Sequence, residues 1–418
     1  MVAVKGAAAV LGVVLAIVAA ACAGGDEGVE FVATSSCAEL LYEGEGEPDV
    51  IVTSDFPRRG VGGTTTKLMV DAIELVLRQH EFRAGELGVG YQSCNDTVGE
   101  EPYDAGLCRR NARAYVATDA VVGVIGPWNS GCAVEQIPIV SRRDAGPLAL
   151  ISPSNTFIGL TRTAFAKPLY PDGVRSYLRV VTHDEAQGAA AAHLARRLGA
   201  RRAVVVNQSL RDDYVRGLTV SFLRAARTLG LATTQFEWEL RERYTELAAS
   251  VAAVRPDVVY LVGLPNENGK TLVEDLRDAL PGVRLFAPDS FAADDIAEEL
   301  GPAGEGMLVT VPGIPAEVLP PAGKRFLGAL GPAFVDPSGP DVPEAAQAAE
   351  VLLDAIARSD GTRASVVEEL FATKVENGIL GSFSFDRFGD IDPAPVGIYR
   401  FRDGRVVGES VVRAPLGS

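Results

Sequence analysis

The sequence predicts an α/β protein made of two lobes, each a doubly wound parallel sheet. Short apolar runs, typical of strands buried on both faces, alternate with helical patterns between residues 49 and 151. The same alternation starts again near residue 202. Because 418 residues are too many for one core, two successive sets of βαβ units indicate two lobes.

The first set begins with the strand DVIVTSD (49–55), a glycine-containing loop and a helix over 64–81. The loop, FPRRGVGG, has neither the spacing of a P-loop nor that of a dinucleotide-binding fingerprint, so we expect no nucleotide there. The remaining elements continue the alternation, with strands at 85–96, 121–126 and 147–151 and helices at 108–118 and 132–144.

The second set begins after SYLRVV (176–181), where the chain enters a new neighbourhood. The predicted helices cover 182–200, 213–229, 244–254, 266–280 and 292–300, and the predicted strands cover 202–207, 233–239, 257–263 and 283–289. A strand at 307–315 then leads back to the first lobe, followed by helices over 343–361 and 366–374. The tail predicts β-hairpins, with a tight turn at RDGRV (402–406).

The N-terminal 22 residues predict an export signal that is not part of the fold. Lys5 precedes an uncharged apolar run from Gly6 to Ala21, which is shorter than a typical membrane span. Three alanines followed by Cys22 resemble a bacterial lipoprotein cleavage site, at which the cysteine becomes lipidated. Ordinary signal-peptidase cleavage is the alternative, because Ala19 departs from that pattern. We expect residues 23–36 to form a flexible acidic tether.

Four cysteines remain after Cys22: Cys37, Cys94, Cys108 and Cys132. An even number in an exported chain predicts two disulfides, for which three pairings are possible. A metal site is the alternative, but the sequence has no C-x-x-C and none of its three histidines stands near a cysteine pair. We therefore expect disulfides, and neither a metal nor a cofactor.

The chain is acidic, with a formal net charge of −16. This charge argues against nucleic acid and against an anionic membrane surface as partners. The sequence contains no later apolar run long enough to span a bilayer. We expect a monomer that is soluble apart from its anchor, held at the outer face of the cytoplasmic membrane or located in the periplasm.

Small polar residues follow two neighbouring predicted strands. The strand VVGVIG (121–126) leads into PWNSG, where Ser130 is expected to cap the next helix. The strand PLALI (147–151) leads into SPSNT, which contains Ser154 and Thr156. The carboxyl ends of parallel strands meet at one sheet edge, where open α/β sheets bind ligands, and a helix N-terminus there favours an anionic group. The alternative is that these residues only cap turns.

The order of several motifs resembles a known family. GVIGPWNSG precedes PLALISPSNT, and RVVTHDEAQGAAAA, VVYLVGLPNENGKTLVEDLR, FAPDSF, GMLVTVPG and NGILGSFSFDRFGD follow. This series is similar to the substrate-binding lipoproteins of branched-chain amino acid ABC transporters, which have the type I periplasmic binding-protein fold. The resemblance covers residues 49–402 and implies two lobes that close over a ligand.

The resemblance also implies lobe boundaries. Three crossings are expected, near Val180, Val311 and Asn377. The first lobe then comprises 37–179 and 312–377, and the second comprises 180–311 and 378–418.

The family's ligand-binding positions can be carried over to this chain. Ser130 and Thr156, with backbone groups of Ser154, match positions that hold an amino acid's carboxylate and ammonium. Tyr214 matches a tyrosine that covers the ligand from the second lobe. Asp289 stands where leucine-type binders have an acidic residue that pairs with the ammonium; by itself it could equally cap the following helix.

Other positions are weaker members of this predicted site. Leu264 stands where such binders often place an aromatic side chain, and Asn129 adjoins Ser130. The segment from Phe56 to Arg59 matches a cleft-lining loop. Arg58 and its neighbour are either solvated or face an additional acidic group on the ligand.

Three functions are compatible with these features. The first is a receptor that captures an amino acid or related solute by lobe closure and delivers it to an ABC permease. The second is a sensing lobe that acts with a separate signalling protein. The third is an exported hydrolase, which is the weakest because the sequence has no G-x-S-x-G and only three scattered histidines.

Overall fold

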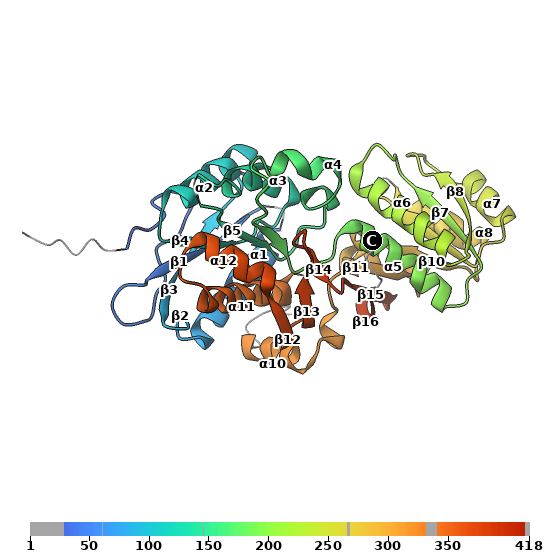
Figure 1. The fold of residues 1–418 in the computed structure, drawn as a ribbon. Coiled ribbons are helices and arrows are strands. Elements are labelled where there is room, and N and C mark those ends of the chain that lie inside the picture. The colour runs from blue at the N-terminus through green and yellow to red at the C-terminus, as the bar shows by residue number, and fades with distance from the viewer. Residues whose placement is uncertain (1–28, 61, 145, 266–267, 332–340, 414–418) are drawn as a thin grey trace, which may run out of the picture.

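The computed structural model describes residues 29–60, 62–144, 146–265, 268–331 and 341–413. They form two lobes that lie side by side, each with its own sheet and helices (Figure 1). The predicted α/β class with two parallel-sheet lobes is confirmed. The leader and the lipidation candidate Cys22 lie outside the described residues.

The first lobe contains a six-stranded sheet in the order β2-β3-β1-β4-β5-β6. Five strands run parallel, and the short β2 is the antiparallel edge strand. The strands at its centre are buried along their whole length, because helices cover both faces. The bounds are β1 (Val50–Phe56), β2 (Arg83–Ala84), β3 (Leu87–Asn95), β4 (Val121–Ile125), β5 (Ala149–Ser152) and β6 (Tyr177–Arg179).

Two groups of helices cover opposite faces of this sheet. One face carries α1 (Gly63–Gln79), α11 (Val342–Arg358) and α12 (Arg363–Ala372), with α10 (Pro321–Leu330) beside α11. The other face carries α2 (Ala105–Ala117), α3 (Ser130–Val140), α4 (Thr163–Ala166) and the 3₁₀ turns η1 (Ile158–Leu160) and η2 (Lys167–Leu169). The return of the chain after β11 therefore completes the first lobe.

The second lobe contains a seven-stranded sheet in the order β16-β15-β11-β10-β9-β7-β8. Five parallel strands are β7 (Arg202–Asn207), β8 (Ala232–Glu237), β9 (Val258–Val262), β10 (Arg284–Ala287) and β11 (Leu308–Pro312). The tail adds an antiparallel hairpin, β15 (Pro395–Arg402) and β16 (Arg405–Arg413). Asp403 and Gly404 join them, both with positive φ, which is the tight turn predicted at this position.

The helices of the second lobe also divide between two faces of the sheet. α5 (Asp184–Arg197) and α6 (Asp213–Thr228) pack on one face, and α7 (Thr245–Ala253), α8 (Gly269–Ala279) and α9 (Asp294–Gly304) pack on the other. Two 3₁₀ turns are η3 (Asp289–Phe291), which follows β10, and η4 (Ala316–Val318), which follows β11.

A third, three-stranded sheet differs from the expectation. It contains β12 (Lys374–Gly378), β13 (Gly381–Phe385) and β14 (Ile391–Asp392). Phe383, Phe385 and Ile391 belong to the same hydrophobic core as β1 and α11 of the first lobe. The segment 378–392, expected in the second lobe, thus packs on the first, and the third crossing comes before β15 instead of near Asn377. The alternation of apolar residues predicted the strands but not which lobe they cover.

The three crossings between the lobes meet at one backbone carbonyl. The oxygen of Pro395, at the start of β15, accepts hydrogen bonds from the Thr182 hydroxyl of the first crossing and from the Gly313 N–H of the second, at 2.5 and 3.1 Å. Gly313 has φ +105°, and a Cβ there would lie 2.6 Å from a carboxylate oxygen of Glu344. The crossings therefore lie together, as a hinge between two lobes requires.

Charged residues buried beside the crossings hold β6 to the segment before β15. The fully buried Arg179 donates to Asp390 at 2.7 Å and to the carbonyls of Asn155 and Phe157. Arg162 also pairs with Asp390. These arginines hold the pKa of Asp390 below its ordinary value despite its burial. Removal of Asp390 would leave the buried charge of Arg179 without its carboxylate.

Two disulfides stabilise the first lobe, as the even number of cysteines predicted. Cys37 pairs with Cys94 at the end of β3, and Cys108 of α2 pairs with Cys132 of α3. Among the described residues, Asp96 with Cys108 and Cys132 has a spacing suited to a metal, but the two sulfurs are already bonded to each other. The structure thus selects one of the three pairings left open by the sequence.

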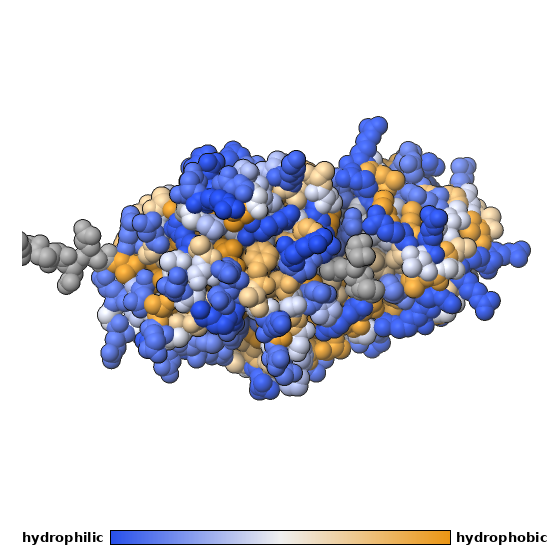
Figure 2. All heavy atoms as spheres, in the orientation of Figure 1, coloured by the Kyte–Doolittle hydropathy of each residue, from blue (hydrophilic) through white to orange (hydrophobic). Residues whose placement is uncertain are grey.

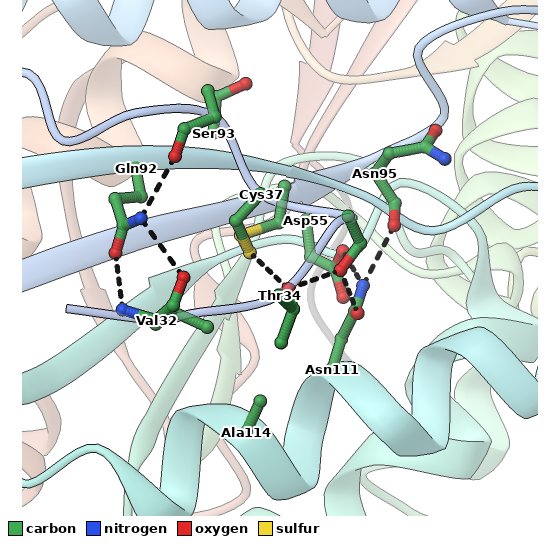
Figure 3. The surroundings of a disulfide bond; sticks show 12 residues. Val32, Thr34, Cys37, Asp55, Gln92, Ser93, Asn95, Asn111 and Ala114 are labelled. Carbon is green, nitrogen blue, oxygen red and sulfur yellow. Dashed lines mark hydrogen bonds between the residues drawn. A yellow bond between two sulfur atoms is a disulfide. The ribbon is translucent and has the colours of Figure 1, made fainter.

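The C-terminal part of the expected tether is held against the first lobe. Figure 3 shows this segment running beside the strand that carries Gln92, whose side chain bonds the backbone of Val32 in both directions. Val32 is 2 % exposed, and Ser36 donates to Asn111 of α2. Residues 29–36 were expected to be a flexible tether, but burial of Val32 and these hydrogen bonds attach them to the lobe.

The surface is predominantly hydrophilic on the face that Figure 2 presents. Large exposed apolar side chains, among them Leu240 and Leu264, are spread over both lobes. No helix in the described part of the chain combines the length and apolar character needed to cross a membrane.

Candidate functional site

The first wall of the candidate site begins where β4 ends. Asn129 is the N-cap of α3, with its side-chain oxygen accepting from the Gly131 N–H at 2.8 Å. Ser130, expected to be the cap, is instead the first residue of the helix. Its hydroxyl oxygen accepts from the Phe157 N–H at 3.4 Å, which leaves the hydroxyl proton for another acceptor.

The loop after β5 is bonded to the loop after β4. Ser154 donates from its hydroxyl to the Trp128 carbonyl at 2.7 Å, and Asn155 donates to the same carbonyl at 2.8 Å. Ser152 donates to the carbonyl of Pro127 at 2.9 Å. The two predicted loops therefore do share one sheet edge. Ser154 holds their shape, and Asn155 and Ser152 are supporting residues that the sequence analysis missed.

Thr156 connects the first wall to the second lobe. Its carbonyl accepts from the N–H of Asp184, the first residue of α5, at 3.0 Å, and its side chain opposes the rise in the pKa of the Asp184 carboxylate. The sequence predicted a helix here but no site role for Asp184. It lies directly after the first crossing, so the carboxylate stands between the two lobes.

The second wall combines one side chain from each of three elements. Asp289 begins η3, and one of its carboxylate oxygens accepts from the Tyr214 hydroxyl of α6 and from the Gln187 amide of α5, each at 2.8 Å. The Ser290 N–H donates to the Tyr214 oxygen at 3.3 Å. The structure thus brings together the predicted Tyr214 and Asp289 and adds Gln187, which the sequence analysis did not single out.

The acceptors of this wall are unevenly satisfied. One carboxylate oxygen of Asp184 and the amide oxygen of Gln187 are buried and have no hydrogen-bond partner within the described residues. Buried polar atoms are almost always paired, so two such acceptors within the first turn of α5 favour a donor-rich group between the lobes. The Gln187 amide is directed at Asp289, since its nitrogen donates to that carboxylate.

Burial governs the electrostatics of the second wall. It raises the pKa of Asp184 to about 8, with a further contribution from the nearby charge of Asp289. The pKa of Asp289 is also raised by burial, although the bonds from Gln187 and Tyr214 oppose the shift. A cation placed between these carboxylates would favour their ionised forms. The wall is therefore suited to a positive group.

A groove between the lobes lies next to these residues. A pocket of about 240 Å³ is lined by Phe157 and Phe165 on the first lobe and by Glu185, Arg216 and Val220 on the second. Phe157 and Glu185 directly follow Thr156 and Asp184 in the chain. A larger pocket of about 530 Å³, lined in part by His80 and Glu350, lies on the first lobe and shares no residue with the candidate site.

Three of the weaker candidates point elsewhere or face solvent. Phe56 is 1 % exposed and belongs to the core of the first lobe, and with Arg58 it lines a separate pocket of about 330 Å³ beside α1. The Arg58 guanidinium donates to the backbone and hydroxyl of Ser93 in β3. Leu264 is 45 % exposed, while its backbone is held at both ends by the side chain of Gln208.

Comparison with known proteins places this geometry in a family. The family model described as periplasmic binding protein matches residues 56–400. None of the curated proteins compared with the chain matches its sequence.

Several solved structures have the same fold. The leucine-binding protein LivK of Thermotoga maritima is 23 % identical, with a TM-score of 0.67 over 87 % of this chain and 99 % of that one. A substrate-binding protein of Desulfitobacterium hafniense in complex with leucine is 19 % identical, with a TM-score of 0.68 over 86 % and 99 %. A solute-binding protein of R. palustris in complex with benzoate is 15 % identical, with a TM-score of 0.62 over 87 % and 96 %.

These likenesses confirm the two-lobed fold that the motif series implied. The matched model spans most of the sequence and includes both walls of the candidate site. The chain therefore belongs to the periplasmic binding protein family.

Proposed function

We propose that this protein is an extracytoplasmic solute receptor that binds an amino acid, or a close relative, between its lobes and delivers it to an ABC permease. The observation that carries this proposal is that the two walls favour ligand groups of opposite charge. The first wall presents the Ser130 hydroxyl at the start of α3, where a helix N-terminus favours an anion. The second presents Asp184 and Asp289, which favour a cation.

An amino acid has one group for each wall. Its carboxylate accepts from the Ser130 hydroxyl, at the positive end of the α3 dipole. Its ammonium has three N–H donors, which bond oxygens of Asp184, Gln187 and Asp289. The oxygens concerned on Asp184 and Gln187 have no other partner in the described residues. Tyr214 orients Asp289 through its hydroxyl.

Ligand binding drives closure in this mechanism. A molecule that contacts both walls stabilises the closed arrangement, and the gain is limited to its difference in affinity for the closed and open states. The hinge supports such a motion because its three crossings meet at Pro395. The permease then recognises the closed form. Lipidation of Cys22 would hold the receptor at the membrane beside its permease.

The relatives extend the range of solutes to be tested. Solved structures of similar proteins hold leucine, isoleucine or benzoate as the ligands of those proteins. Benzoate has a carboxylate but no ammonium, so it leaves the second wall without its partner. We therefore expect this chain to bind amino acids in preference to aromatic acids.

A thermal-shift screen of the mature chain tests this function. A ligand specific for the folded state raises the melting temperature as its concentration exceeds its Kd. The panel contains the twenty amino acids, their deaminated acids and their decarboxylated amines. We expect shifts only with molecules that carry an ammonium group, and smaller shifts in Asp289→Asn. Shifts with the deaminated acids alone, or with no amino acid, would contradict the proposal.

A further inference from the structure

A third carboxylate lies beside the first wall. Asp341 directly precedes α11 and accepts from the indole N–H of Trp128 at 3.0 Å. Trp128 belongs to the loop after β4, and its carbonyl is the acceptor for Ser154 and Asn155. Asp341 therefore stands next to the residues proposed to hold the ligand's carboxylate, on the lobe opposite Asp289.

Asp289 is close enough to affect the titration of each of the other two carboxylates. Asp289 raises the pKa of both Asp184 and Asp341, although Asp341 lies on the other lobe, and burial is the larger cause in each case. Within the described residues none of the three forms an ion pair. Acidic side chains of both lobes thus lie within electrostatic reach of Asp289.

The basic side chains nearby are already committed. The fully buried Arg179 donates to Asp390, to Thr161 and to two backbone carbonyls. One ammonium brings a single positive charge to three carboxylates. The α-ammonium already has its acceptors on Asp184, Gln187 and Asp289, so an uncharged side chain on the ligand would bring no positive charge to Asp341.

We propose that the ligand carries a second positive charge, as a basic amino acid does, and that this charge binds Asp341 beside the indole of Trp128. This rests on the proposed function and specifies its substrate class. The first ammonium occupies the second wall, while the side-chain cation bonds the Asp341 carboxylate, one oxygen of which remains beside the bond to Trp128. The Trp128 ring, half-buried and packed near Gly62, offers a cation a favourable face.

Lysine and norleucine form a matched pair for the test, because they share the α-amino acid group and the four-carbon chain and differ in the terminal ammonium. Titration calorimetry on the mature chain at pH 7.5 gives the ratio of their Kd values. We expect lysine to bind at least about tenfold more tightly, as a hydrogen bond to a charged group implies. Equal binding, or tighter binding of norleucine, would overturn the inference while leaving the amino-acid function intact.

The variant Asp341→Asn locates the effect. Asparagine still accepts from the Trp128 indole and tolerates the positive φ of 73° at this position. We expect this change to weaken lysine about tenfold and to leave norleucine within a factor of two. An unchanged lysine-to-norleucine ratio would show that Asp341 does not bind the second charge. If the wild-type protein bound neither lysine nor norleucine, nor any other amino acid of the panel, the proposed function itself would be rejected.

Discussion

Replacement of Asp184 by asparagine tests the electrostatic account of the second wall. The carboxylate is 3 % exposed, and burial raises its pKa from 3.8 to about 8. Its charged neighbours are Asp289 and Asp212, which raise the pKa further, and Arg179, which lowers it. Asparagine has nearly the same shape and cannot ionise, so the variant isolates the cost of the charge.

The raised pKa of Asp184 makes the free energy of unfolding depend on pH. Because the folded-state pKa is raised, the stability associated with protonated Asp184 is fully present below about pH 4 and is lost as the pH rises to about 8. A shift of about 4 pKa units corresponds to an upper limit of about 6 kcal/mol. Relaxation and water penetration reduce the cost of a buried charge, so we expect a measured effect of about 2–4 kcal/mol.

Urea denaturation of the ligand-free protein at pH 5 and pH 8 measures this effect. The free energy of unfolding of the wild type should fall more between these pH values than that of Asp184→Asn, by about 2–4 kcal/mol. Asp213→Asn, an exposed change in the first turn of α6, is the matched control and should follow the wild type. Parallel pH profiles for the wild type and Asp184→Asn would refute the reasoning.

Three further changes probe the wall, the disulfide and the hinge. Tyr214→Phe removes the hydroxyl that orients the carboxylate of the second wall, so calorimetry should show about tenfold weaker binding with an unchanged fold; wild-type affinity would contradict this role. Cys108→Ser with Cys132→Ser opens a loop whose ends are 24 residues apart and should cost about 3 kcal/mol in urea denaturation, whereas a loss below about 1 kcal/mol would count against the disulfide's contribution. Asp390→Asn leaves the fully buried Arg179 without its carboxylate and should cost about 3–5 kcal/mol by the same method, whereas a loss below about 1 kcal/mol would contradict a buried ion pair at the hinge.

The sheet strands were the most predictable part of the fold. Runs such as 121–126 and 257–263 are apolar because helices cover both faces of the sheet, and this burial is visible in the sequence. The lobe on which 378–392 packs was not predictable, because Phe383 and Phe385 satisfy the strand pattern equally well against either lobe. Likewise Val32 alone gave no signal that the tether's end is buried.

The candidate site was predictable only where a residue follows a strand. Ser130, Thr156 and Asp289 each come just after one, which places them at a sheet edge. Asp184 looked like an ordinary acidic residue at a helix N-terminus, where such residues are common. Its importance comes from the position of α5 directly after a crossing, which depends on how the two lobes meet.

The central claim is that an amino acid binds between the lobes and holds them together. Small-angle X-ray scattering of the mature chain, with and without the tightest ligand of the thermal-shift panel, measures this most directly. The account predicts a smaller radius of gyration at saturation, and a weaker response at the same ligand concentration in Asp289→Asn. An unchanged radius of gyration at saturation would contradict closure over the ligand.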